Sequence, residues 1–227
     1  MKTKKTVWIP AIIAVAVAAL LVIYYYYMSS VSGGEPGPRP PEGGVGNVSA
    51  GPVGGRPGGG GRGGNGEIFK TLGTISVFLG AAAFSWFWFK KKLRSPSLLV
   101  RKAGKLLHSM HKLLGWATLI LIAVHGVYFL ITKLQDNKTY TGLAGFAILL
   151  AIAGYGFFIN KVRNKWMRTV HRSLGLLWVP VLLLHAGGSA IMAVVASLAV
   201  GILVWVLERM SGKTAESIIS QAAVKRP

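Results

Sequence analysis

Long apolar runs alternate with short polar clusters along this chain. A helix that crosses the hydrocarbon core of a bilayer needs roughly 20 mostly apolar residues. The pattern predicts an all-α, polytopic transmembrane bundle of about six spans, near 7–28, 69–89, 113–132, 142–159, 173–187 and 190–207. We expect the fifth helix to begin earlier, near Arg168, with its polar first turns at the membrane surface. Only Gly187, Gly188 and Ser189 separate spans five and six, which predicts a tight helical hairpin.

The overall composition agrees with this membrane assignment. Hydrophobic residues make up 52% of the 227 positions, and the mean hydropathy is +0.51. These values are too apolar for a soluble domain of this size and predict an integral membrane protein whose main partner is the lipid bilayer. The chain contains no cysteine. Disulfides, thiolate-held iron–sulfur clusters and thioether-linked haem are therefore excluded.

A segment rich in glycine and proline follows the first span. Residues 29–67 include 16 Gly and 6 Pro among 39 positions, a composition that cannot bury a core and predicts a disordered tether. The first span lacks a small-residue cleavage site after it, so we interpret it as an uncleaved anchor rather than a signal peptide. The predicted division is an anchor helix at 1–28, an extracytoplasmic tether at 29–67, a five-helix domain at 68–207 and a cytoplasmic tail at 208–227.

Basic residues greatly outnumber acidic ones, with 26 Lys and Arg against 6 Asp and Glu and a net charge of +20. Such a balance can indicate nucleic-acid binding. Here the charges form short clusters between apolar runs, where positive residues fix membrane orientation, so no nucleic-acid partner is expected. With a cytoplasmic N-terminus, 20 basic residues lie inside and 6 outside. This asymmetry predicts that both termini are cytoplasmic, in a membrane such as the bacterial plasma membrane.

Four of the five histidines form two pairs with the same spacing. His111 and His125 lie on the third span, and His171 and His185 on the fifth, each pair 14 residues apart. Fourteen helical steps return a side chain to within about 40° of its starting direction and about 21 Å further along the axis. Because the third and fifth spans run in the same direction, His111 should lie level with His171, and His125 with His185.

Paired imidazoles that face each other across a helix bundle can ligate the iron of a haem from both sides. With both axial positions filled, the iron has no open site for substrate, and the chemistry implied is electron transfer. A histidine in an apolar helix can also be a hydrogen-bonded core residue. Polar residues at membrane depth are costly, however, and four at matched levels favour the ligand interpretation. The sequence thus predicts two b-type haems.

The sequences around the two histidine pairs resemble each other, HKLLGWATLILIAVHG and HRSLGLLWVPVLLLHA. Gly115 and Gly175 lie one turn beyond the first histidines, where a missing side chain either admits a flat ring or allows close helix packing. Lys112 and Arg172 could meet haem propionates, although membrane orientation alone explains a positive charge there. His108 has no partner at this spacing. It is either solvated, directed at a propionate, or a competitor of His111.

At these residues the chain resembles the ferric-reductase-like transmembrane domain, a family of di-haem b-type membrane cytochromes. The resemblance covers about 68–207 and implies that His111 and His171 hold an inner haem, and His125 and His185 an outer one. Only 20 residues follow position 207, without a Gly-rich nucleotide fingerprint. Electrons are therefore expected from a separate reductase or from membrane quinol, and an extracytoplasmic acceptor, such as a partner protein, receives them.

Two other functions remain open at this stage. A quinol-linked cytochrome b subunit of a larger complex would use the same histidines. A haem-free transporter or assembly scaffold would use them to bind protons or a metal, or to form hydrogen bonds within the bundle. On the leading hypothesis the chain is an oxidoreductase component that lacks its own flavin or nicotinamide domain.

Overall fold

The computed structural model describes residues 4–32, 64–134, 136–162 and 164–224, and the prediction of an all-α bundle is confirmed within them. Each of the six helices is long and apolar enough to cross a membrane. The helices are α1 (Lys4–Ser32), α2 (Gly64–Phe89), α3 (Leu98–Thr132), α4 (Lys138–Phe158), α5 (Lys165–Ala186) and α6 (Gly188–Val224). The predicted tether is mostly outside the described residues.

Several helices extend beyond their apolar runs. The third helix begins at Leu98 rather than near 113, and α6 continues through the predicted tail to Val224. The fifth begins at Lys165, where the side chain of Asn164 accepts a hydrogen bond from the Trp166 amide at 3.0 Å. Such an N-cap satisfies one of the free amides of the first turn. Hydropathy marks only the part of a helix suited to lipid, so it misses polar turns at the ends.

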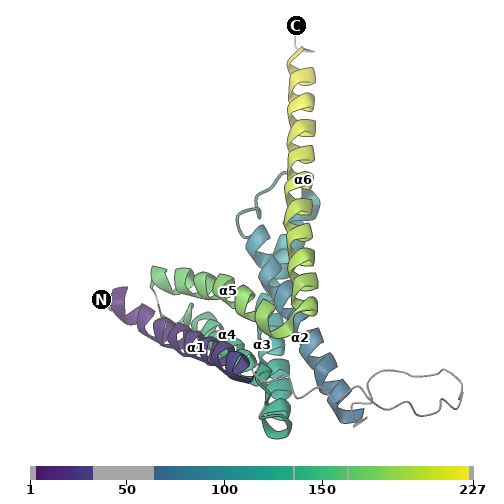
Figure 1. Ribbon diagram of the computed structural model, residues 1–227. Coiled ribbons are helices and arrows are strands. Elements are labelled where there is room, and N and C mark those ends of the chain that lie inside the picture. Colours follow the sequence, from purple (N-terminus) through teal and green to yellow (C-terminus); the bar gives the residue numbers. More distant parts are fainter. Residues whose placement is uncertain (1–3, 33–63, 135, 163, 225–227) are drawn as a thin grey trace, which may run out of the picture.

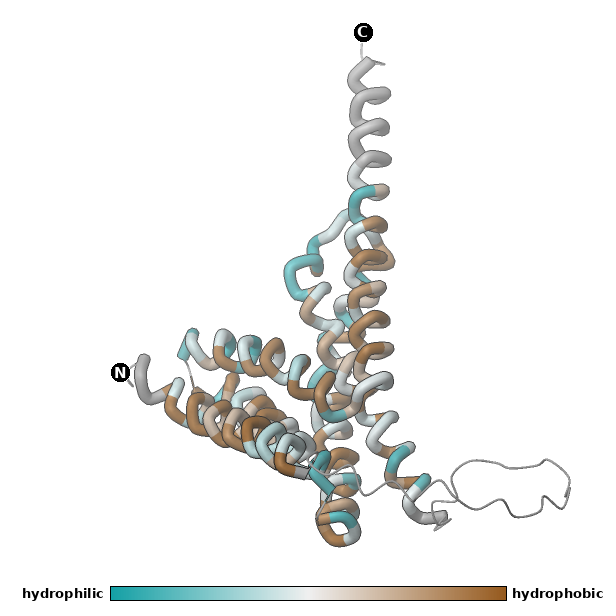
Figure 2. Tube along the Cα trace, in the orientation of Figure 1, coloured by the Kyte–Doolittle hydropathy of each residue, from teal (hydrophilic) through white to brown (hydrophobic). Residues whose placement is uncertain are grey.

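The six helices form two groups of three, inclined to one another (Figure 1). In one group, α1, α4 and α5 share a core around Ile148, Val170 and Leu174. In the other, α2, α3 and α6 share a smaller core around Phe89, Val100 and Val204. Hydrophobic residues run along both groups (Figure 2). The third and fifth helices, which carry the paired histidines, therefore belong to different groups and meet between them.

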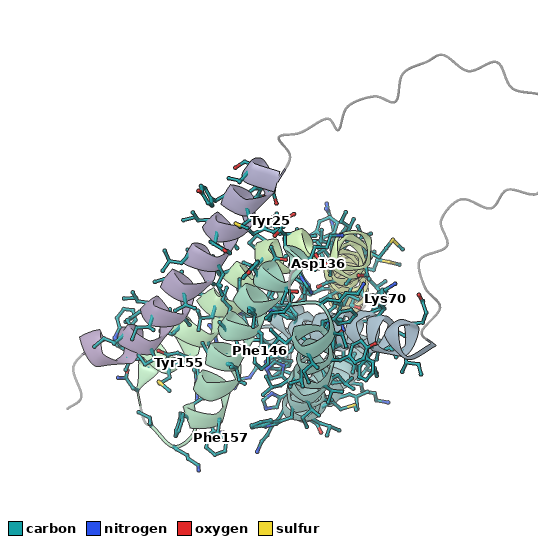
Figure 3. The ribbon with its side chains drawn as sticks, turned by 60° about the horizontal axis from the view of Figure 1, so that its bottom comes forward. Tyr25, Lys70, Asp136, Phe146, Tyr155 and Phe157 are labelled. Carbon is teal, nitrogen blue, oxygen red and sulfur yellow. The ribbon has the colours of Figure 1, made fainter. Side chains whose placement is uncertain are left out.

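The first helix packs against α4, and a tyrosine joins the two. Pro10 interrupts α1, and beside it the amide of Ala11 donates to the Tyr155 hydroxyl at 3.2 Å. That hydroxyl in turn donates to the Val7 carbonyl, the group that the Ala11 amide would bond in a regular helix. Figure 3 shows Tyr155 between α1 and α4. The anchor helix, which the sequence set apart from the other five, thus shares a core with α4 and α5.

The last helix packs mainly against α2, not along α5 as the expected hairpin implied. Gly187 makes the turn between α5 and α6 with φ of +53°, a left-handed conformation that favours glycine. Gly201 then lies against the indole of Trp88, whose nitrogen donates to the Ser197 hydroxyl at 3.2 Å. The turn is as short as predicted, but its geometry sends α6 to the other helix group.

Candidate haem-binding site

The structure brings the four repeated histidines together as two pairs. The ring centroids of His111 and His171 are 6.1 Å apart, and the two planes are inclined by 81°. The rings of His125 and His185 are 6.4 Å apart at 83°. Each pair joins α3 to α5, at the levels that the 14-residue spacing predicted. The two pairs therefore share almost the same geometry at two depths.

Three of these imidazoles are held by backbone carbonyls of neighbouring helices. The Nδ1 atom lies 2.9 Å from the Ala83 oxygen in His111, 2.7 Å from the Phe69 oxygen in His125, and 3.0 Å from the Ile152 oxygen in His171. A carbonyl can only accept, so each Nδ1 carries the proton and donates it. The lone pair of a neutral ring is then on Nε2, the nitrogen left free to ligate a metal.

The fourth imidazole, that of His185, is protonated at the same nitrogen, and its hydrogen-bond acceptor is a hydroxyl. Thr141 Oγ1 lies 3.1 Å from the Nδ1 atom of His185 and 2.8 Å from the Lys138 carbonyl. The hydroxyl donates its single hydrogen to that carbonyl, so it accepts from the histidine. All four rings thus have the same tautomer and present Nε2.

Glycines on α2 and α4 make room for three of the rings. A Cβ atom at Gly73 would lie 2.6 Å from Cε1 of His125, one at Gly142 would lie 2.8 Å from Cε1 of His185, and one at Gly156 would lie 3.3 Å from Cε1 of His171. None of these three glycines was predicted to belong to the site. Gly142 and Gly156 are 14 residues apart, like the paired histidines, and this shared spacing could have marked them as neighbours of the rings.

A cavity of about 610 Å³ adjoins the His111–His171 pair. Gly115 and Gly175, which the sequence placed one turn beyond these histidines, both line it, and no atom lies within 4 Å of a Cβ built at either. These two glycines therefore border open space and do not mediate close helix packing in this structure.

Basic side chains surround the same cavity. Lys112 and Arg172 line it, together with Lys90 and Arg168. Partial burial, and next the charge of Arg172, lower the pKa of Lys90. His108 also lines the cavity, but its ring packs against Trp86 with centroids 4.7 Å apart and joins neither pair. The competition between His108 and His111 that the sequence left open is absent from the observed pairing.

A tryptophan separates the two histidine pairs. Trp178 is midway between His171 and His185 in the sequence and is buried, and its indole nitrogen donates to the Gly145 carbonyl at 3.0 Å. Its ring is so close to Gly80 that a Cβ there would lie 3.1 Å away. Thr118, midway between His111 and His125, is also buried. Both side chains also line the cavity beside His111 and His171, whereas His125 and His185 do not.

The ligand set suits a haem better than a bare metal ion. No group of three or more His, Cys, Asp or Glu side chains converges within the described residues, whereas a protein-bound zinc takes at least three such ligands. A metal–imidazole bond is about 2 Å and the ring centre lies about 1.1 Å further, so two rings that ligate one iron from opposite sides have centroids about 6 Å apart. The observed 6.1 and 6.4 Å fit this value.

Comparisons of the chain with protein-family models, with curated proteins and with solved structures give no match. The case for a function therefore depends on the geometry of the site itself.

Proposed function

We propose that this protein binds two b-type haems and serves as an electron-transfer component of a membrane oxidoreductase system. His111 and His171 would hold one haem, and His125 and His185 the other. When bound between two imidazoles, a haem would supply one-electron transfer. The observation that carries the proposal is that both ring pairs have the separation of axial ligands while every Nδ1 is hydrogen-bonded, which leaves Nε2 for the iron.

The other residues of the site have supporting roles in this proposal. Gly115 and Gly175 leave the space that a flat macrocycle requires. Lys112 and Arg172 offer positive charge for propionate groups at the rim of the same cavity. Trp178 is buried midway between the two histidines of α5. The carbonyls of Phe69, Ala83 and Ile152 and the Thr141 hydroxyl fix the direction of each ring, as outer hydrogen bonds do at metal sites.

The proposed direction of transfer is from the cytoplasmic side, where a separate reductase or membrane quinol donates, to an extracytoplasmic acceptor. This direction follows from the family resemblance alone. The distribution of basic residues supports the membrane orientation, with both termini in the cytoplasm of a cell such as a bacterium. Within the described residues, six helices are joined by turns and bends, and no strand is present.

The visible spectrum of histidine variants tests the proposal. His125→Ala should reduce the haem content from two per chain to about one and leave low-spin bands from the remaining site, because the two pairs are separated by Trp178. His108→Ala is the matched control on the same helix and should retain both haems. Loss of haem in the control, or full retention in His125→Ala, would contradict the assignment. Rapid reduction by a quinol analogue without a flavoprotein would identify the donor class as quinol.

A further inference from the structure

A second cavity opens at the turn between α4 and α5, and it shares four lining residues with the cavity beside His111 and His171. It has a volume of about 540 Å³, and six of the seven residues around it are polar or basic. Three are cations on α5, two are asparagines, and one is a threonine. They are Asn160, Asn164, Lys165, Arg168, Thr169 and Arg172, with Ile159 as the single apolar wall.

The cations lie on one face of α5, where they repel each other. Arg168 is three residues after Lys165 and four before Arg172, spacings at which like charges on a helix are destabilising. Lys165 and Arg168 also lie in the first turn, where the helix dipole is positive and disfavours cations, and that turn contains no acidic residue. Both effects make this face unfavourable without a counter-charge.

No acidic side chain supplies that counter-charge within the part of the chain that has been described. None of the residues that line the cavity is Asp or Glu. Glu67 is paired with Lys70 and Glu208 with Lys92, while Asp136 accepts from the Lys138 amide at the start of α4.

We propose that this cavity binds the phosphate group of an anionic ligand. Guanidinium forks and amide donors recognise phosphate oxygens, and the start of a helix adds positive potential. Basic pockets between transmembrane helices also bind the head groups of anionic lipids. A lipid phosphate and a soluble phosphate share this chemistry. Arg168 and Arg172 border both cavities, whereas Asn164, Lys165 and Thr169 border this one alone. If the proposed function holds, a haem propionate would share Arg172 with the bound anion, and the other cations would serve the anion.

The alternative explanation is that these cations serve only to fix the membrane orientation of the protein. Cations elsewhere in the chain provide a matched control that distinguishes the two explanations. The start of α3 also carries exposed cations, Lys102 and Lys105, which do not line the cavity. Lys165→Gln combined with Arg168→Gln removes two charges from the cavity, and Lys102→Gln combined with Lys105→Gln removes two from the other helix. If orientation alone explains the cations, the two double variants should behave alike.

The test measures thermal unfolding of the full chain, since a ligand that binds only the folded state raises the midpoint. One arm compares inorganic phosphate with chloride at equal ionic strength. The other compares nanodiscs of phosphatidylcholine with nanodiscs that also contain phosphatidylglycerol. A rise in the phosphate arm identifies a soluble phosphate, and a rise in the phosphatidylglycerol arm alone identifies a lipid head group.

We expect the cavity double variant to weaken apparent affinity for the phosphate ligand by about tenfold, as loss of two charge-assisted contacts implies, and the α3 double variant to keep it. Arg168→Lys, which keeps the charge but loses the fork, should give an intermediate value. The proposal is overturned if neither arm raises the midpoint, or if both double variants lose the rise equally. The visible spectrum of each sample reports haem separately, so failure of the haem assignment is distinguishable from failure of this one.

Discussion

Replacing Gly73 tests whether close packing against α2 positions the ring of His125. Its replacement by alanine adds one methyl group, whose carbon would lie 2.6 Å from Cε1 and 2.7 Å from Nδ1 of His125. Ordinary carbon contacts are about 3.5–4.0 Å, so the ring must move by about 1 Å. That movement also breaks the 2.7 Å hydrogen bond from Nδ1 to the Phe69 carbonyl, which fixes the orientation of the ring.

The magnitude follows from three contributions. Overpacking costs about 1–3 kcal/mol, and the lost hydrogen bond about 0.5–1.5 kcal/mol. Alanine regains about 1 kcal/mol of helix propensity. The net destabilisation is therefore about 2 kcal/mol. For a chain of this size such a change lowers the unfolding midpoint by about 4–8 °C. The same ring displacement should remove the haem held by His125 and His185.

The assay measures haem per chain and the unfolding midpoint for Gly73→Ala beside Gly154→Ala. Gly154 lies on α4 with no atom within 4 Å of an added Cβ, so its variant should keep two haems and an equal or higher midpoint. If Gly73→Ala also retains two haems and its midpoint is unchanged, the close approach of α2 to His125 does not position the ring and the reasoning is refuted.

Two further predictions concern hydrogen bonds that the sequence did not reveal. Thr141→Val removes the acceptor of the His185 Nδ1–H. It should lower the free energy of unfolding by about 1–3 kcal/mol, because the imidazole donor is left unpaired. Haem should also dissociate faster from the His125–His185 site than from the His111–His171 site, as measured by transfer to apomyoglobin. Unchanged dissociation would show that the hydroxyl does not orient the ring. Tyr155→Phe removes the hydroxyl between Ala11 and Val7 and should lower stability by about 1–2 kcal/mol. Haem content should not change in that variant, and a loss of haem would mean that α1 supports the site directly.

The sequence predicted the helices and the histidine pairs for a definite physical reason. Hydropathy over 20 residues reports lipid contact directly, and a 14-residue spacing fixes both the face and the level of a side chain on a helix. The pairing of His111 with His171 needed only one further assumption, that α3 and α5 run in the same direction. These features depend on local periodicity, which a single sequence contains.

The surroundings of the rings could not be predicted in the same way. The bonds from the histidines to the Phe69, Ala83 and Ile152 carbonyls involve main-chain atoms, which every residue possesses and no pattern marks. The contact of Gly73 with His125 depends on which helices are neighbours. The packing of α1 on α4 likewise depends on the Tyr155 hydroxyl, which accepts a hydrogen bond from the Ala11 amide, 144 positions earlier in the chain. Such relations appear only once the helices are assembled.

The visible absorption spectrum of the purified full-length protein, with haem quantified per chain, tests the central claim most directly. We predict low-spin b-type bands, in both oxidised and reduced states, at a stoichiometry of two haems per chain. Protein produced with ample haem that is folded and yet featureless in the visible region would contradict the account.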